Sequence, residues 1–113
     1  MKLLWLSLLT IVALSGCSTG IPVSITNQSA SPIESVTISG SGFTKHVGTI
    51  PSGRTVSVRV KPSGESGMAV AFRSGSRQIR SRPQGYFEGS GPYEVSVVVA
   101  PDLSVRVNGD LRY

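Results

Sequence analysis

Apolar side chains recur at every second position along most of the chain, and this pattern limits the fold more than any other feature. The alternating residues are Ile21, Val23 and Ile25; Val36 and Ile38; Val56, Val58 and Val60; Tyr93, Val95, Val97 and Val99; and Leu103, Val105 and Val107. A repeat of two is typical of a β-strand with one buried face. Residues 68–72 (MAVAF) are apolar on both faces, with small alanines on one, which predicts a central strand. No stretch has the 3.6-residue period of a helix.

Turn residues separate these segments at intervals of roughly ten residues. Gly, Pro, Ser and Asp cluster at residues 40–42, 51–53, 62–67, 74–76 and 101–102, at spacings typical of hairpins. Seven or eight short strands of this kind predict an all-β fold, a small antiparallel β-sandwich of immunoglobulin-like or transthyretin-like size. A small closed barrel is the alternative. A transmembrane barrel is disfavoured because its strands need about 10 residues each.

The N-terminus has the composition of a secretory signal. Met1-Lys2 gives a short positive start, and an apolar run follows from Leu3 to Leu14. The run is too short to cross a bilayer, which takes about 20 residues, and a buried core helix is the alternative. Its place at the chain start and the turn-rich sequence behind it favour the signal.

The residues Leu14-Ser15-Gly16-Cys17 that end this run resemble the lipobox of bacterial lipoproteins. The resemblance implies a diacylglyceryl group on the thiol of Cys17, cleavage just before it, and acylation of the freed amine. Residues 1–16 are then a cleaved signal peptide, 17–20 a lipidated tether and 21–113 a single β-sandwich domain. In that family, Ser18 in place of Asp favours the outer membrane, facing the periplasm, in a Gram-negative host. The alternative is an ordinary secreted protein with a chance cysteine.

Cleavage before Cys17 leaves 97 of the 113 residues, enough for one small domain. Cys17 is the single cysteine, so this domain has no disulfide and must be stabilised by packing alone. Lys2 leaves with the signal, so ten of the eleven basic side chains remain against six acidic ones. This mild positive charge favours anionic lipid, glycan or an acidic protein patch over nucleic acid.

Residues that could carry catalysis or bind a metal are sparse. His46 is the single histidine, and it lies in a predicted strand (FTKHVGTI) with no acid nearby in sequence, so a solvent-facing role is expected. The acids Glu65, Glu88, Glu94 and Asp102 are isolated and lack metal-ligand spacing. The sequence therefore predicts no enzyme activity, no metal site and no cofactor besides the covalent lipid. Asn108-Gly109 predicts a late hairpin turn before a short final strand or tail.

Two segments near the C-terminal half depart from the alternating pattern. Residues 73–82 contain Arg73, Arg77, Arg80 and Arg82 with no acid among them, and Gly75 predicts a hairpin turn that places Arg80 and Arg82 on one strand face. These arginines are either a contact patch for carboxylate or phosphate groups or a solvated face that discourages edge-to-edge pairing. Residues 81–93 form the longest glycine-rich loop, in which Tyr86 and Phe87 are either a ligand platform or a plug for the sandwich.

These features together predict a non-enzymatic function. The chain is expected to be a lipid-anchored protein of the bacterial envelope that acts as a binding or accessory module in an envelope or secretion assembly. Its partners are then the membrane, through the lipid, and an envelope protein, with anionic lipid or glycan as other ligands. The alternative is an immunity or inhibitor lipoprotein, in which the arginines and residues 83–92 block a periplasmic toxin or enzyme.

Overall fold

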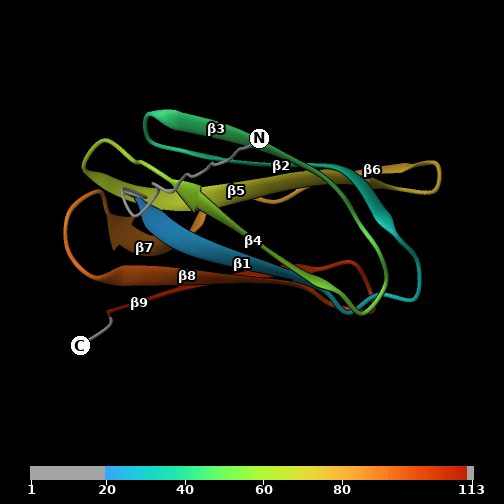
Figure 1. Cartoon of the computed structure of the whole chain (residues 1–113). Helices are drawn as coiled ribbons and strands as arrows, with labels where there is room; N and C mark the ends of the chain where they lie inside the picture. Colours follow the sequence, from blue (N-terminus) through green and yellow to red (C-terminus); the bar gives the residue numbers. More distant parts are fainter. Residues whose placement is uncertain (1–19, 112–113) are drawn as a thin grey trace, which may run out of the picture.

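The computed structural model describes residues 20–111, which form two β-sheets packed face to face (Figure 1). The four-stranded sheet has the order β4 (Thr55–Val60), β1 (Ile21–Asn27), β8 (Tyr93–Val99) and β9 (Val105–Leu111). The five-stranded sheet has the order β3 (Phe43–Ile50), β2 (Ile33–Gly40), β5 (Glu65–Ser74) and β6 (Arg77–Arg80), and β7 (Gln84–Glu88) also pairs with β5. The predicted all-β sandwich is confirmed, with nine strands in the described part of the chain instead of seven or eight.

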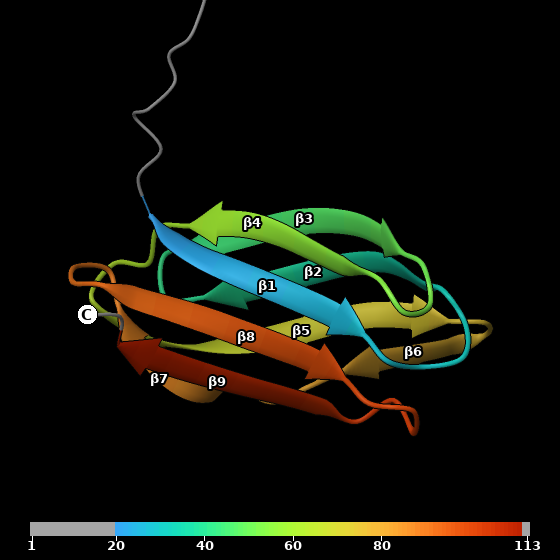
Figure 2. The same ribbon diagram turned by 60° about the horizontal axis from the view of Figure 1, so that its bottom comes forward.

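The core lies between the sheets and is built by the alternating residues (Figure 2). In β1, the burial pattern alternates without interruption, so that Val23 and Ile25 expose 1% and 0% of their surface while Ser24 faces outward. The predicted central strand is confirmed, because β5 pairs with β2 on one side and with β6 and β7 on the other. Its Met68, Val70 and Phe72 are fully buried. Burying each such side chain stabilises the fold by about 1.5–3 kcal/mol relative to exposure.

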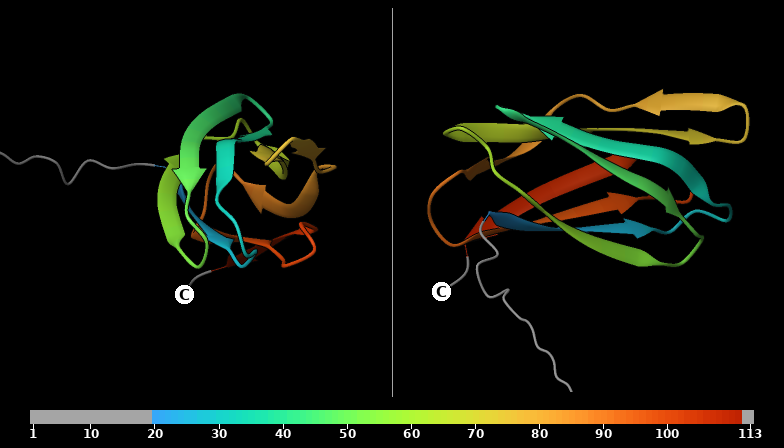
Figure 3. Two further views of the ribbon diagram at one scale, coloured as in Figure 1. Left: turned by 90° about the vertical axis from the view of Figure 1, so that its right-hand side faces the viewer. Right: turned by 45° about the horizontal axis from the view of Figure 1, so that its top comes forward.

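The chain order places one parallel pair in a sheet that the spacing predicted as antiparallel. β1 pairs with β8 in parallel and with β4 antiparallel. Residues 40–42, 74–76 and 101–102 do turn hairpins, but residues 51–54 and 61–64 carry the chain from one sheet to the other (Figure 3). Spacing alone predicted hairpins at those two places, and this was wrong because equal loop lengths serve both kinds of connection.

Three local predictions are also corrected. Residues 81–93 are not one long loop, because β7 forms within them and pairs with β5. Asn108-Gly109 makes no turn, because β9 stays paired with β8 through both residues. Gly109 is needed there because the main-chain oxygen of Tyr86 occupies the place of a Cβ atom. Leu103 does not extend β9 but lies in the β8–β9 turn with φ of 71°.

The two ends of the sandwich differ, and the register identifies them. At the entry end, β1 begins at Ile21, which is opposite Val60 of β4. At the far end, β1 ends at Asn27 and the β5–β6 hairpin turns at residues 75–76 (Figure 2). Glu34 is opposite Arg73 near this turn, which places the hairpin at the far end with the start of β2.

A buried asparagine joins the sheets at the far end. The Nδ2 of Asn27 donates hydrogen bonds to the carbonyl oxygens of Ser31, at 2.8 Å, and Ile50, at 3.0 Å. Its Oδ1 accepts from the amide and the hydroxyl of Ser29, at 2.9 Å and 2.6 Å. Asn27 and Ser29 expose 0% and 4% of their surface, so the side chain satisfies polar groups that would otherwise be buried without partners.

Candidate functional site

Three of the four predicted arginines lie together at the free edge of the five-stranded sheet. Arg77 and Arg80 begin and end β6, and Arg82 follows in the link to β7. All three are exposed, and within residues 20–111 none of them forms an ion pair. We call Arg77, Arg80 and Arg82 the arginine edge. Arg73 is separate, because its guanidinium binds the carboxylate of Glu34 on β2 at 2.5 Å.

The predicted aromatic part of the patch does not join these arginines. Phe87 exposes 0% of its surface and packs 6.4 Å from Phe43 between ring centroids, so it is a core residue and offers no contact surface. Tyr86 is 48% exposed and lies 6.3 Å from Tyr93 in an edge-to-face pair. Its hydroxyl donates to Glu88 at 2.9 Å, and this hydrogen bond, together with desolvation and the nearby carboxylate charges, raises the pKa of Tyr86 to about 12. Neither aromatic residue lines the hollows beside Arg80.

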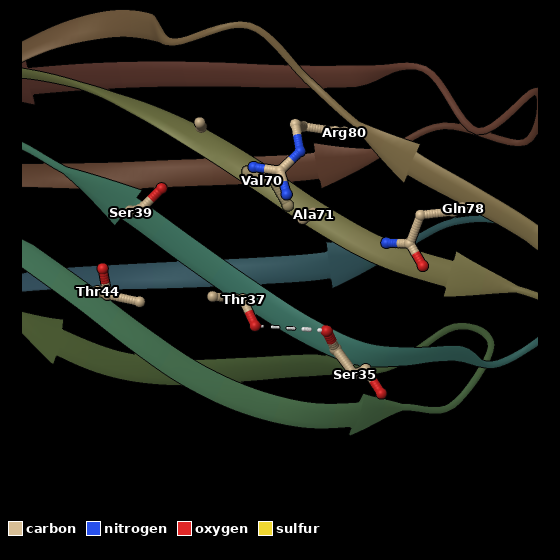
Figure 4. Close-up of a pocket in the computed structure, with 9 residues that line it drawn as sticks. Ser35, Thr37, Ser39, Thr44, Val70, Ala71, Gln78 and Arg80 are labelled. Atoms are coloured by element: carbon tan, nitrogen blue, oxygen red, sulfur yellow. Dashed lines mark hydrogen bonds between the residues drawn. The ribbon is translucent and has the colours of Figure 1, made fainter.

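One hollow lies on the outer face of the five-stranded sheet (Figure 4). This outer groove has a volume of about 380 Å³ and a floor that includes Ala69 and Ala71 of β5. On one side it is lined by hydroxyl side chains of β2 and β3, namely Ser35, Thr37, Ser39 and Thr44. On the other side stand Gln78 and Arg80, and Figure 4 shows the guanidinium of Arg80 reaching from β6 over β5. The groove exists because alanines are short beside these longer neighbours.

A second hollow lies between the two sheets, on the other side of Arg80. This edge cleft has a volume of about 420 Å³. Its apolar lining comes from the half-buried side chains of Ile79, Leu103 and Val105, which pack against the core. Arg80 and Arg82 line it together, so the structure brings these two arginines to one site.

Gln84 borders the cleft and is bonded to β9. Its Nε2 donates to the carbonyl oxygen of Val105 at 3.0 Å, and its Oε1 accepts from the amide of Val107 at 3.3 Å. The side chain therefore takes the place of a strand along this part of the β9 edge and ties β7 to the four-stranded sheet. Beyond Gln84, β6 and β9 are not paired with each other.

Leu103 lines the cleft from a strained main-chain conformation. Its φ of 71° lies in the left-handed region, which a leucine occupies at a cost of about 1–3 kcal/mol. The amide of Leu103 donates to the carbonyl of Ala100 at 2.8 Å, which holds the turn in this form. Strain of this kind accumulates at functional sites, so it adds to the case for the cleft. The alternating pattern predicted Leu103 as a strand residue and gave no sign of the turn.

The described residues include few other side chains that could act in catalysis or metal binding. His46 is exposed on β3, as predicted, and its Nδ1 lies 3.2 Å from the hydroxyl of Thr37. Between residues 20 and 111, no three histidine, cysteine or acidic side chains are close enough to hold a metal ion. The same residues include no helix with the length and apolar composition needed to cross a membrane. Cys17, the predicted lipidation site, lies outside the described residues.

Comparison with known proteins adds no relative. No family model, curated protein or solved structure matches the chain. The arginine edge and the two hollows beside it are the features of residues 20–111 that point to a function.

Proposed function

We propose that this protein is a lipid-anchored, non-enzymatic binding module of a bacterial cell envelope, whose arginine edge holds a protein in an envelope or secretion assembly. The observation that carries the binding role is the grouping of Arg77, Arg80 and Arg82 at one sheet edge, where no acidic side chain of residues 20–111 pairs with them. Guanidinium groups bind carboxylates through paired, charge-assisted hydrogen bonds. An acidic protein surface is the partner that this edge suits best.

The anchor is supported by the lipobox-like residues Leu14-Ser15-Gly16-Cys17. Two or three acyl chains on Cys17 give stable membrane binding, whereas one gives marginal binding. Ile21 is four residue steps after Cys17, and at about 3.5 Å per step the tether spans at most about 14 Å. The tether thus keeps the entry end of the sandwich close to the lipid, and Ser18 favours the outer membrane facing the periplasm.

This geometry favours a partner beyond the anchoring bilayer. β1 has seven residues and is about 23 Å long, and the β5–β6 hairpin with Arg77 lies at the far end. An envelope protein can reach that end from the periplasmic side. Anionic lipid or glycan of the anchoring membrane is the less favoured ligand, because the tether holds the opposite end there. Confinement beside the membrane also raises the effective concentration for a neighbour on the same surface.

A periplasmic inhibitor is the second candidate. The β5–β6 hairpin is a narrow element with exposed Arg77 at its start in β6, and it could insert into the site of a toxin or enzyme. An inhibitor forms a stoichiometric complex with one toxin and loses its partner when that toxin is absent. An assembly subunit keeps its partner under all growth conditions.

The anchor is tested by metabolic labelling with an alkyne fatty acid in bacteria that express the full chain. Wild-type protein and the control Ser18→Ala should both be labelled and processed. Cys17→Ser should carry no label and accumulate as the unprocessed precursor. Normal processing of Cys17→Ser would overturn the lipoprotein assignment.

A further inference from the structure

We propose that β6 pairs with an extended strand of the partner protein, and that this strand has the pattern acidic–apolar–acidic. The site is the free edge of β6 together with the edge cleft beneath it. The inference deepens the proposed function, on which it rests for the presence of an envelope partner. The main chain, the cleft lining and the arginines each support it.

The main chain of β6 offers unused hydrogen-bonding groups. β6 is the last strand in its sheet and pairs with β5 alone. The amide of Ser81 donates to the carbonyl of Val70, which marks Val70 and Ser81 as a hydrogen-bonded pair. Such pairs alternate along an antiparallel ladder, so Ile79 is bonded to β5 while the N–H and C=O of Gln78 and Arg80 point away from it. These four groups form the template that an added strand requires.

The cleft defines what the middle residue of the added strand must be. A residue opposite Ile79 lies on the same face of the sheet as Ile79. Ile79 lines the edge cleft with Leu103 and Val105, so the residue opposite enters an apolar hollow of about 420 Å³. An aliphatic side chain fits there, because burying apolar surface is favourable and a charge would lose its hydration.

The arginines define the flanking residues. Residues opposite Gln78 and Arg80 point to the outer face, on the side of the outer groove that both side chains line. Arg80 and Arg82 are exposed and have no ion pair within residues 20–111, and the guanidinium of Arg80, which lies over β5 in Figure 4, can turn toward the free edge. Carboxylates at the flanking positions would therefore meet unpaired guanidinium groups. A lysine at either position would be repelled.

The contrasting explanation is that the arginines protect the edge. Short edge strands with basic residues prevent edge-to-edge pairing between copies of a protein. On that account, charge reversal at the edge produces dimers through β6, and no acidic strand binds to the wild-type protein. The two accounts predict opposite results in one binding experiment.

The experiment uses the full chain in detergent micelles and the fluorescein-labelled peptide acetyl-SVEVEVS-amide. Fluorescence anisotropy should show saturable binding, which weakens several-fold for acetyl-SVEAEVS-amide and disappears for acetyl-SVKVKVS-amide. The double variant Arg80→Glu/Arg82→Glu should weaken binding by at least about tenfold. Arg59→Glu/Arg106→Glu is the matched control, because it changes charge equally on the other sheet and should bind as wild type. Absence of peptide binding to the wild type, or equal loss in both variants, overturns the proposal.

Hydrogen exchange resolved to single residues tests the pairing itself. Bound peptide should slow exchange at the amides of Gln78 and Arg80 and leave that of Ile79 unchanged. Gln78→Pro removes one outward N–H and no main-chain bond to β5, so it should abolish peptide binding. The side-chain bond from Gln78 to the carbonyl of Phe72 is lost as well, so Gln78→Ala, which loses that bond but keeps the N–H, is the control and should still bind. In the wild-type protein, equal protection of all β6 amides by the peptide, or protection of none, contradicts strand addition. This result does not depend on whether Gln78→Pro folds. Fatty-acid labelling is independent of these readouts, so failure of the anchor and failure of strand pairing are distinguishable.

Discussion

Replacement of Asn27 by aspartate should cost the domain a large part of its stability. The change keeps the shape of the side chain but turns the Nδ2 donor into an oxygen, which then faces the carbonyl oxygens of Ser31 and Ile50. Loss of the bond to Ile50 leaves a buried carbonyl unsatisfied at about 1–3 kcal/mol, and loss of the part-buried bond to Ser31 adds about 1 kcal/mol, so the change costs roughly 2–4 kcal/mol. A domain of this size is stabilised by only about 5–14 kcal/mol in total.

The loss should also depend on pH, with a definite sign. Burial between two carbonyl oxygens favours the protonated carboxyl, so its pKa in the folded protein rises above the value of about 3.9 in the unfolded chain. A group of this kind destabilises least below the unfolded pKa and increasingly as the pH rises through the folded pKa. Asn27→Asp should therefore lose more stability at pH 8 than at pH 4.

Urea unfolding of a chain beginning at Ser18, followed by far-ultraviolet circular dichroism, measures both effects. The matched control is Asn108→Asp, the same chemical change on an exposed side chain of β9, which should shift stability by no more than about 0.5 kcal/mol. A loss below about 1 kcal/mol for Asn27→Asp, or a loss that shrinks as the pH rises, would refute the role assigned to the network.

Three further changes give distinct outcomes. Glu88→Gln should lower the pKa of Tyr86 from about 12 toward 10, because the hydrogen bond to the carboxylate is lost. An ultraviolet titration, with Tyr86→Phe to identify the signal, measures this shift, and an unchanged titration contradicts that cause. The contribution of this bond to stability is present below pH 10 and is lost as the pH rises toward 12. Gly109→Ala should reduce stability by about 1–3 kcal/mol in urea unfolding, because its Cβ meets the Tyr86 carbonyl and separates β7 from β9; wild-type stability would contradict this packing. Leu103→Gly should change stability by less than about 1 kcal/mol, because relief of the positive φ is offset by loss of the half-buried side chain that packs against the core. The variant should nevertheless weaken binding of acetyl-SVEVEVS-amide, and unchanged binding would remove Leu103 from the site.

Much of the fold follows from the period-two pattern. The pattern predicted Val23, Ile25 and Val97 as inward-facing, and all three are buried. It could not predict which strands pair. A short loop can join two neighbours of one sheet or carry the chain to the other sheet, and the pattern of apolar residues is the same in both cases. That is why the parallel pairing of β1 and β8 was missed.

The candidate site was predictable in part. An acid-free run of arginines was visible in the sequence, but the separation of Arg73 from the others depends on Glu34, which lies 39 residues away. Phe87 was ambiguous because the sequence does not show that β7 pairs with β5 and turns that ring inward. The alanines at 69 and 71 were recognised as small, and the groove above them could have been expected from that observation. The edge cleft depends on the conformation of Leu103, for which the sequence carries no signal.

Site-specific photo-cross-linking in native membranes tests most directly whether the β6 edge is the partner-binding surface. The full chain is expressed with a photoreactive amino acid at position 78, on β6, or at position 108, on the outer face of the other sheet. A single stoichiometric adduct from position 78, mapped by mass spectrometry to an acidic–apolar–acidic segment of an envelope protein, is the predicted result. An adduct from position 108 alone, or equal adducts from both positions, would contradict it.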